Sequence, residues 1–289
     1  MERYYNIAGL NISIVGNAQE MYKDGKMFDA FEVLDAPESG PAIRFVFEVK
    51  EILDAPEGEC VYKEPAKRIY LDEEKEIRYI GAIENNLKDA YLRVERNGTT
   101  ANVQVNKAQM VDVITPKIVL NALGIERLAV EANGCILHVA YIIHDGKGIL
   151  FTAPSGVGKS TQAELWKELR GAEIVNGDRA VVRLVDDTFC VCGIPFSGSS
   201  KYCENVTVPI DAIVYLRQAR QTQVERIKGK DAFCKILEGV SFAAWSRSDT
   251  EKVLTLIQTL IQNVPVYQLS CTPDESAVIA LENELRKEW

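Results

Sequence analysis

The chain has 289 residues and a formal net charge of −9 at pH 7, and 47% of its residues are hydrophobic. This length is enough for one large or two modest globular domains. The acidic balance argues against nucleic acid as a partner, because phosphate backbones are bound by surfaces rich in Lys and Arg. No apolar run is long enough to span a membrane, and the amino terminus lacks the build of a signal peptide. With seven scattered cysteines and no Cys-x-x-Cys pair, we expect a cytoplasmic protein with reduced thiols and no membrane partner.

The first part of the chain has the period-two alternation of apolar and polar residues that predicts β-strands. The predicted strands are 11–15, 42–49, 76–80, 90–95 and 100–105. Asn97-Gly98 favours a turn between the last two of them. Nothing in this part has a catalytic signature. We therefore predict that residues 1–110 form a β-rich accessory domain of unknown role.

From about residue 111 the pattern changes to alternating helices and strands. A helical pattern over 107–132, broken at Pro116 and Gly124, leads into an apolar strand over 135–143. The later predicted elements are strands at 148–152, 172–176, 212–217 and 266–269, with helices at 162–169, 230–245, 249–262 and after residue 275. Ser248 and Thr272 begin capping boxes for the last two helices. This alternation predicts an α/β nucleotide-binding domain over 111–289.

The most informative motif joins the strand at 148–152 to the helix at 162–169. A strand, a small-residue loop and a helix amino terminus are the context that a Walker A phosphate-binding loop requires. The backbone amides of such a loop cradle phosphate oxygens beside the positive end of the helix dipole. The expected phosphate-binding residues are Ala153, Pro154, Ser155, Gly156, Val157, Gly158, Lys159, Ser160 and Thr161.

Two side chains of this loop predict ATP and Mg²⁺ as ligands. Lys159 supplies a positive charge for the outer phosphates, and the Ser160 hydroxyl can hold Mg²⁺. The usual first glycine of the motif is Ala153 here. A chance glycine turn with an exposed lysine is the alternative, and the flanking strand and helix argue against it. The motif by itself does not distinguish a kinase from an ATPase or a GTPase.

A carboxylate follows the next predicted strand. The strand at 172–176 ends in Gly177-Asp178-Arg179, and parallel-sheet geometry would put its carboxyl end beside the phosphate loop. Asp178 would then bind Mg²⁺ or accept a proton from an acceptor hydroxyl, while Arg179 would neutralise charge on the transferring phosphoryl group. The alternative is a simple turn with an exposed salt bridge. His138, on the apolar strand before the loop, is as a lone histidine more often structural.

A second loop, 196–201, reads Phe-Ser-Gly-Ser-Ser-Lys. Three serines, a glycine and a lysine after a strand suit the binding of an anionic or hydroxyl-bearing group. A flexible hairpin end has the same composition, so both interpretations stay open.

Taken together, residues 138–184 resemble the HPr kinase/phosphorylase family, bacterial P-loop serine kinases related in their core to phosphoenolpyruvate carboxykinases. In that family a histidine precedes the phosphate loop by one hairpin, as His138 does here, and the loop reads Gly-x-Ser-Gly-x-Gly-Lys-Ser. A later strand ends in Ala-Asp-Asp-Arg, against Asn176-Gly-Asp-Arg179 here. The resemblance implies that Asp178 is the base for the acceptor serine and that His138, Lys159 and Arg179 belong to the catalytic site.

The chain departs from that family at several points. Gly177 replaces the first aspartate of the family's pair, so one carboxylate near the metal and the acceptor is missing. The segment 192–198 stands where the family has Glu-x-Arg-Gly, and the family's Arg-Pro-Gly-Arg-Asn segment is absent. The resemblance therefore extends to kinase chemistry, whereas HPr docking and the reverse phosphorylase reaction stay open.

These features predict an ATP- and Mg²⁺-dependent serine kinase of the HPr kinase-like type, with an unidentified protein, peptide or small-molecule hydroxyl as acceptor. Its fold would be a P-loop nucleotide-binding α/β domain after a β-rich one, in a chain that can form homo-oligomers. Two alternatives remain. A phosphoenolpyruvate carboxykinase would need more than two histidines and a longer chain. A nucleotide-binding regulator without transfer activity would tolerate the missing carboxylate at Gly177.

Overall fold

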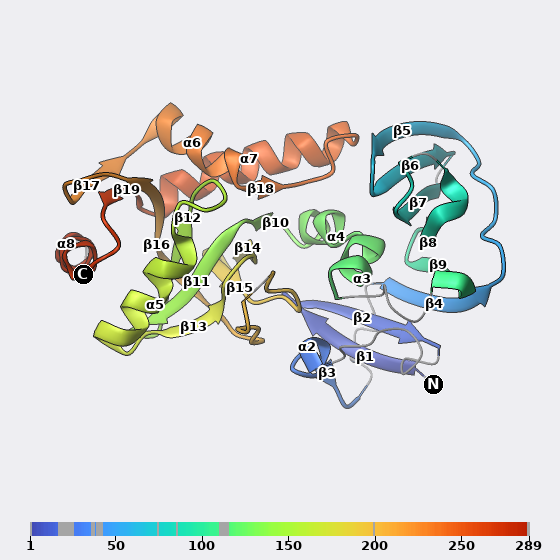
Figure 1. The fold of residues 1–289 in the computed structure, drawn as a ribbon, viewed down its shortest axis with the longest axis horizontal. Helices are drawn as coiled ribbons and strands as arrows, with labels where there is room; N and C mark the ends of the chain where they lie inside the picture. Colours follow the sequence, from blue (N-terminus) through green and yellow to red (C-terminus); the bar gives the residue numbers. More distant parts are fainter. Residues whose placement is uncertain are drawn as a thin grey trace. The chain divides into compact units, whose positions relative to one another are not determined.

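The computed structural model of the protein describes residues 2–16, 26–35, 38, 43–73, 75–84, 86–109, 116–198 and 200–287. The chain divides into two compact units, Met1–Leu128 and Ala129–Trp289. Each unit combines helices with one mixed β-sheet (Figure 1).

The first unit is built on a nine-stranded sheet with the order β3-β1-β2-β4-β9-β8-β7-β6-β5. Its strands are β1 (Glu2–Ile7), β2 (Leu10–Val15), β3 (Glu32–Val33), β4 (Ile43–Lys50), β5 (Glu59–Glu64), β6 (Lys67–Asp72), β7 (Lys75–Gly81), β8 (Ala90–Asn97) and β9 (Thr100–Asn106). Its helical segments are α2 (Lys26–Asp29), η1 (Leu87–Asp89), η2 (Lys107–Gln109), α3 (Pro116–Leu123) and the start of α4 (Ile125–Glu131). The strands expected from the sequence in this region are confirmed, except that residue 42 lies outside the described residues.

The first unit extends to Leu128 rather than ending near residue 110. The reason is a buried ion cluster that ties α4 to the sheet. Arg78 of β7 is 3% exposed, and its guanidinium donates to Glu126 Oε1 at 2.8 Å and to Glu76. Gly124, between α3 and α4, has a φ of +67°, and a Cβ there would lie 2.7 Å from the Arg78 guanidinium. The helix break predicted at Gly124 is therefore confirmed, and it leaves room for this arginine.

The second unit contains a ten-stranded sheet. Along its path the order is β13-β11-β12-β16-β15-β14-β10-β18, and β19 pairs with both β16 and β17. The strands are β10 (Gly134–Leu137), β11 (Val139–His144), β12 (Lys147–Thr152), β13 (Glu173–Asn176), β14 (Ala180–Val185), β15 (Thr188–Cys192), β16 (Thr207–Gln218), β17 (Gln223–Ile227), β18 (Val240–Ser241) and β19 (Val266–Cys271). The β12–β16 and β16–β19 pairs are parallel, and the other pairs are antiparallel.

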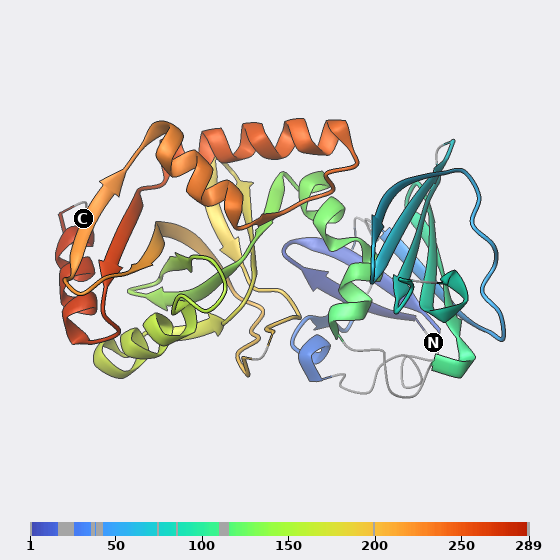
Figure 2. The same ribbon diagram turned by 45° about the horizontal axis from the view of Figure 1, so that its top comes forward.

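Helices cover both faces of the central strands (Figure 2). On one face α6 (Gly229–Glu238) and α7 (Arg247–Asn263) pack on side chains such as Tyr141 and Leu150. On the other face α5 (Lys159–Arg170) and α8 (Glu275–Leu285) pack on their chain neighbours Ile142 and Phe151. The alternation follows from the period of a β-strand, in which successive side chains point to opposite faces.

Three local expectations for this unit were wrong. The helix expected over 230–245 ends at Glu238, because Gly239 stops it and the short strand β18 follows. The caps of the last two helices are Ser246 and Asp274 rather than Ser248 and Thr272. The apolar run 135–143 is divided at His138 into β10 and β11, which pair with different strands.

Candidate functional site

The glycine loop connects the carboxyl end of β12 to the amino end of α5. Gly156 and Gly158 have φ values of +79° and +124°, a region that side chains disfavour. A Cβ on either glycine would meet nothing within 4 Å, so the backbone conformation requires glycine and the space in front of the loop is open. Gly158 is also the N-cap of α5, and no side chain caps the helix there. The first amides of a twelve-residue helix therefore face the loop with their positive dipole end.

Lys159 lies inside this loop rather than on its surface. The residue is 7% exposed, and its Nζ donates to the carbonyl oxygens of Ala153 at 3.0 Å and Pro154 at 3.4 Å. Burial lowers the pKa of the ammonium group, and the charge of Asp178 acts against that shift. A buried ammonium that donates to carbonyl oxygens is well suited to attract an anion to the loop.

Strand β13 runs in the same direction as β12, although the two strands are not neighbours. Both pair antiparallel with β11, which lies between them. The sequence argument placed Asp178 beside the loop by parallel-sheet geometry, and the two strands are parallel in direction although β11 separates them. The carboxyl ends of β12 and β13 nevertheless share one edge. The Ser160 hydroxyl lies 3.5 Å from the carbonyl oxygen of Gly177 and donates to it.

Asp178 contacts His138 and Arg179 at this edge. Its Oδ1 lies 3.3 Å from His138 Nε2, and its Oδ2 lies 3.3 Å from Arg179 Nε. The hydrogen bond from His138 is the main reason why the pKa of Asp178 is lowered, and Arg179 contributes to the same shift while burial opposes it. Asp178 is therefore a carboxylate at neutral pH. The structure brings together His138, Asp178 and Arg179. Lys159 is close enough for the Asp178 charge to affect the pKa of its ammonium group.

Backbone contacts fix the position of His138. Its amide donates to the Gly239 carbonyl at 2.8 Å, and its carbonyl accepts from the Thr152 hydroxyl at 3.1 Å. The next amide, that of Val139, donates to the Asp178 carbonyl at 3.0 Å. A Cβ at residue 239 would lie 2.9 Å from Thr152 Oγ1, so this close approach needs glycine.

Asn176 organises the turn that carries Asp178, a role that sequence reasoning missed. The residue is fully buried. Its Oδ1 accepts from the amides of Asp178 at 3.0 Å and Arg179 at 3.1 Å. Its Nδ2 donates to the carbonyls of Ile194 at 3.2 Å and Phe196 at 2.8 Å. An asparagine that begins a turn is a sequence signal for the first pair of bonds, whereas the second pair depends on a distant loop.

That loop, described over 193–198 and 200–204, packs over the Asn176–Arg179 turn. The Arg179 guanidinium lies 5.5 Å from the centre of the Phe196 ring. A Cβ on Gly198, whose φ is +59°, would lie 2.9 Å from Asp178 Oδ1, and a Cβ on Gly177 would lie 2.4 Å from Ser200 Oγ. Ser199, one of the loop serines singled out in the sequence, lies outside the described residues. The loop is therefore packed against the glycine and the carboxylate of the site.

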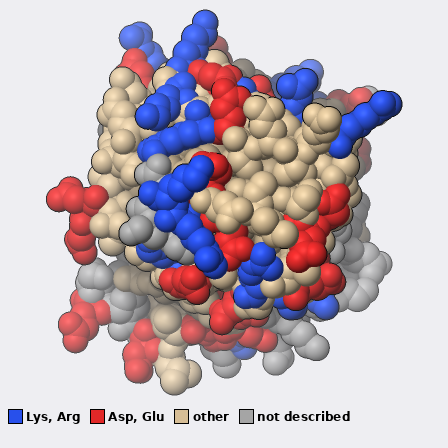
Figure 3. Space-filling model, turned by 90° about the vertical axis from the view of Figure 1, so that its left-hand side faces the viewer, with Lys and Arg blue, Asp and Glu red and all other residues tan. Residues whose placement is uncertain are grey.

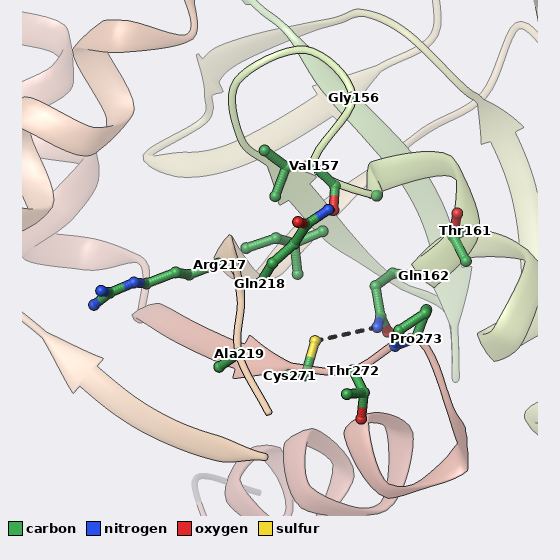
Figure 4. A pocket seen from close by; sticks show the side chains of 12 residues that line it. Gly156, Val157, Thr161, Gln162, Arg217, Gln218, Ala219, Cys271, Thr272 and Pro273 are labelled. Carbon is green, nitrogen blue, oxygen red and sulfur yellow. Dashed lines mark hydrogen bonds between the residues drawn. The ribbon is translucent and has the colours of Figure 1, made fainter. Parts of the chain in front are cut away.

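A cavity of about 430 Å³ opens beside the glycine loop (Figure 4). Its walls come from the loop and start of α5, the end of β16 and the end of β19; they are Gly156, Val157, Gly158, Thr161, Gln162, Leu216, Arg217, Gln218, Ala219, Cys271, Thr272 and Pro273. Gln162 Nε2 donates to Cys271 Sγ at 3.5 Å. Gln162 is 2% exposed, and its Oε1 has no hydrogen-bond partner among the described residues. A buried, unpaired amide oxygen beside a cavity needs an explanation.

The charged surface of this unit is mixed. Figure 3 shows a band of Lys and Arg side chains flanked by Asp and Glu on one face. Within the described ranges, no three His, Cys, Asp or Glu side chains are grouped as a metal site would require. In the same part of the chain, no helix is both long and apolar enough to cross a membrane.

Comparison with known proteins shows one family and gives weak likenesses to solved structures. Residues 103–275, more than half of the chain, match the sequence profile of the family described as SynChlorMet cassette protein ScmC. No curated protein matches the chain. The solved structures include the Hpr(Ser) kinase/phosphatase from Coxiella burnetii, which is 14% identical with a TM-score of 0.32, over 53% of this chain and 89% of that one.

Proposed function

The chain belongs to the ScmC family, and on this premise we propose that it is an HPr kinase-like phosphotransferase that uses ATP and Mg²⁺ to phosphorylate a hydroxyl group. The observation that carries the proposal is the pairing of two groups at one sheet edge. An ionised Asp178 lies beside an open glycine loop that contains the buried Lys159 ammonium. A site for phosphoryl transfer needs both a phosphate cradle and a group that orients or deprotonates the acceptor.

The loop residues fit the phosphates of ATP. The space in front of Gly156 and Gly158 is open, and the free amides at the start of α5 and the Lys159 ammonium provide positive charge toward it. The Ser160 hydroxyl and Asp178 flank the Gly177 carbonyl and would hold Mg²⁺ directly or through water. When bound, ATP supplies the transferable phosphoryl group, and Mg²⁺ neutralises the charge on its outer phosphates.

The remaining residues have distinct roles in this proposal. Asp178 accepts the proton of the acceptor hydroxyl, and His138 holds that carboxylate in place and in its ionised form. Arg179 neutralises charge on the phosphoryl group. The cavity beside the loop receives the nucleoside, because its volume of about 430 Å³ lies in the range of small-molecule sites. Gln162, with its unpaired Oε1, would read the edge of the base.

The acceptor in our proposal is a serine of a protein or peptide, or the hydroxyl of a small molecule. We assign the chemistry to the second unit and an accessory role to the β-rich first unit. We propose a cytoplasmic location, which is in keeping with seven cysteines that form no disulfide with one another.

One observation favours a second candidate function, an ATP-binding regulator without transfer. Gly177 lacks a carboxylate, and Ser200 fills the space where one would project. A regulator would bind the nucleotide and change conformation without needing a second carboxylate.

The test incubates the purified protein with labelled ATP, Mg²⁺ and a cell extract, and follows which species acquires label. We expect labelled acceptor with the native chain and none with Asp178→Asn, although ATP still binds to that variant. Asp231→Asn is the matched control, because Asp231 is an exposed aspartate on α6 that plays no part in the proposal. Equal labelling by the native chain and Asp178→Asn, or binding of ATP without any transfer, would favour the regulator.

A further inference from the structure

The loop over Asp178 holds a serine hydroxyl of this same chain against the candidate transfer site. We propose that Ser200 is a self-phosphorylation site, which receives a phosphoryl group from ATP bound at the glycine loop. This inference rests on the proposed function, and it names one internal acceptor for the same site.

Gly177 lies between the glycine loop, through Ser160, and the loop that carries Ser200. The Ser160 hydroxyl, an expected Mg²⁺ ligand, donates to its carbonyl oxygen at 3.5 Å. On the other side, Ser200 Oγ would lie 2.4 Å from a Cβ built on this glycine, so the hydroxyl is in van der Waals contact with its Cα. Gly177 therefore lies between the hydroxyl proposed to bind Mg²⁺ and the proposed acceptor hydroxyl, and the next residue is the proposed base Asp178.

The Ser200 hydroxyl is also in a suitable hydrogen-bonding state. Its oxygen accepts from the Tyr202 amide at 3.2 Å. Its own proton has no acceptor among the residues that the structure describes, so it is available to a base. Two residues earlier, Gly198 packs against the Asp178 carboxylate, which keeps this part of the loop at the base.

Ser197, in the same loop, does not meet these conditions. It is fully buried, and its hydroxyl donates to the Ser200 carbonyl at 2.6 Å. Ser200 is partly exposed and can be approached by a nucleotide. Hydrogen bonds hold both ends of the loop. The side-chain amide of Asn176 donates to the Ile194 carbonyl, and the backbone amide of Glu204 donates to the Val175 carbonyl at 3.1 Å.

The proposed step is balanced by atoms already named. Ser200 Oγ forms a bond to the γ-phosphorus of ATP, and the bond from that phosphorus to the oxygen bridging the β- and γ-phosphates breaks. The hydroxyl proton passes to the Asp178 carboxylate. ADP leaves with the electron pair of the broken bond. The products are one phosphoserine and one ADP, and no further co-reactant is needed.

After the transfer, the phosphoserine lies beside the Asp178 carboxylate, and the two negative charges repel each other.

The first experiment incubates the pure protein with ATP and Mg²⁺ and maps phosphorylated peptides by mass spectrometry. We expect phosphoserine at residue 200, at a rate independent of protein concentration. Ser200→Ala should remove it, and Ser248→Ala, which changes an exposed serine on α7, should not. Phosphate on another serine, or no phosphate although ATP binds and an external acceptor is labelled, overturns the inference and leaves the proposed function standing. Failure of ATP to bind overturns both.

The second experiment measures position rather than activity. In Ser200→Cys, a non-hydrolysable ATP analogue with Mg²⁺ should slow alkylation of the new thiol by about tenfold or more, while alkylation of the exposed Cys234 stays unchanged as an internal control. Equal alkylation rates with and without the bound analogue would show that Ser200 lies away from the phosphates and would sink the inference.

Discussion

His138 Nε2 lies 3.3 Å from Asp178 Oδ1, and the two residues come from opposite ends of a chain segment that includes the whole glycine loop. His138 follows directly on β10, and Asp178 follows β13 after one residue, Gly177. The amide of Val139, next to His138, donates a hydrogen bond to the Asp178 carbonyl. The pair is therefore assembled by the fold before any ligand arrives. Its electrostatics can be tested directly.

The pH dependence of transfer should follow the Asp178 carboxylate. Its pKa is lowered, mainly by the His138 hydrogen bond, so the acid limb of kcat/KM should lie below the ordinary carboxyl range. His138→Ala raises that pKa and should move the acid limb toward neutral pH, with His138→Gln giving a smaller shift. His144→Gln is the control. An acid limb that stays in place in His138→Ala would contradict the role given to this histidine.

The lowered pKa of Asp178 also makes the free energy of unfolding depend on pH. A carboxyl group with a lowered pKa in the folded state stabilises the fold above its unfolded pKa, and that contribution is lost as the pH falls through the lowered value. Unfolding of Asp178→Asn should therefore depend less on pH in the acid range than unfolding of the native chain. Denaturant unfolding curves at several acidic pH values measure the difference.

Asp178→Asn separates the two roles proposed for this carboxylate. If Asp178 is the base, transfer should fall by roughly a hundred- to ten-thousandfold, because the amide cannot accept a proton. If it mainly holds Mg²⁺, excess metal should restore much of the rate. We expect lost rate to dominate, since one aspartate serves both roles beside Gly177. Near-normal turnover at ordinary Mg²⁺ would exclude both.

Lys159→Ala should weaken ATP binding by roughly ten- to a hundredfold, the loss expected when a charged hydrogen bond of about 1.5–3 kcal/mol is removed. Calorimetry measures the affinity. A thermal unfolding curve is the necessary control, because Nζ also holds the Ala153 and Pro154 carbonyls. A folded variant with unchanged affinity would refute the phosphate-binding assignment.

Gly177→Ala should destabilise the second unit, because the added methyl group would lie 2.4 Å from Ser200 Oγ. Overpacking of this kind costs about 1–3 kcal/mol. Adding Ser200→Gly removes the clashing atoms and should recover most of the loss, whereas Gly177→Ala with Ser248→Gly should not. Thermal unfolding of the native chain, Gly177→Ala, Ser200→Gly and the variant with both changes completes a double-mutant cycle.

Gln162→Leu should weaken nucleotide selectivity without destabilising the fold. Removing an unpaired buried oxygen should leave the stability of the fold unchanged or raise it. If the Gln162 amide hydrogen-bonds to the amino group and a ring nitrogen of adenine, the ratio of the affinities for ATP and GTP should decrease in this variant. Competition between the two nucleotides measures it, and an unchanged preference would leave Gln162 as a structural residue.

Local patterns predicted much of this molecule. The glycine loop and the start of α5 follow from residues that adjoin in the chain, and the first strands follow from simple alternation. The resemblance also pointed to His138 and Asp178 as members of one site, which the structure places in contact.

The parts that sequence could not predict depend on contacts between distant residues. The side-chain amide of Asn176 binds a loop some twenty positions later, and Ser200 fills the space beside Gly177. Gln162 donates a hydrogen bond to Cys271 in the wall of the cavity. The break of the apolar run at His138 is of the same kind, since it depends on the carbonyl of Gly239. Patterns among neighbouring residues of the sequence do not predict these long-range contacts.

Strand β16 links the two sides of the site in a way that hydrogen exchange can detect. Its first residues, from Thr207, pair with β15 and come shortly after the loop that covers Asp178. Its last residues, up to Gln218, line the cavity beside the glycine loop. Gln218 also donates to the Val157 carbonyl at 3.3 Å. A ligand in the cavity thus holds one end of a continuous strand whose other end anchors the loop. Amide protection within 193–204 should therefore change when the cavity is filled, even by a nucleoside that has no phosphates.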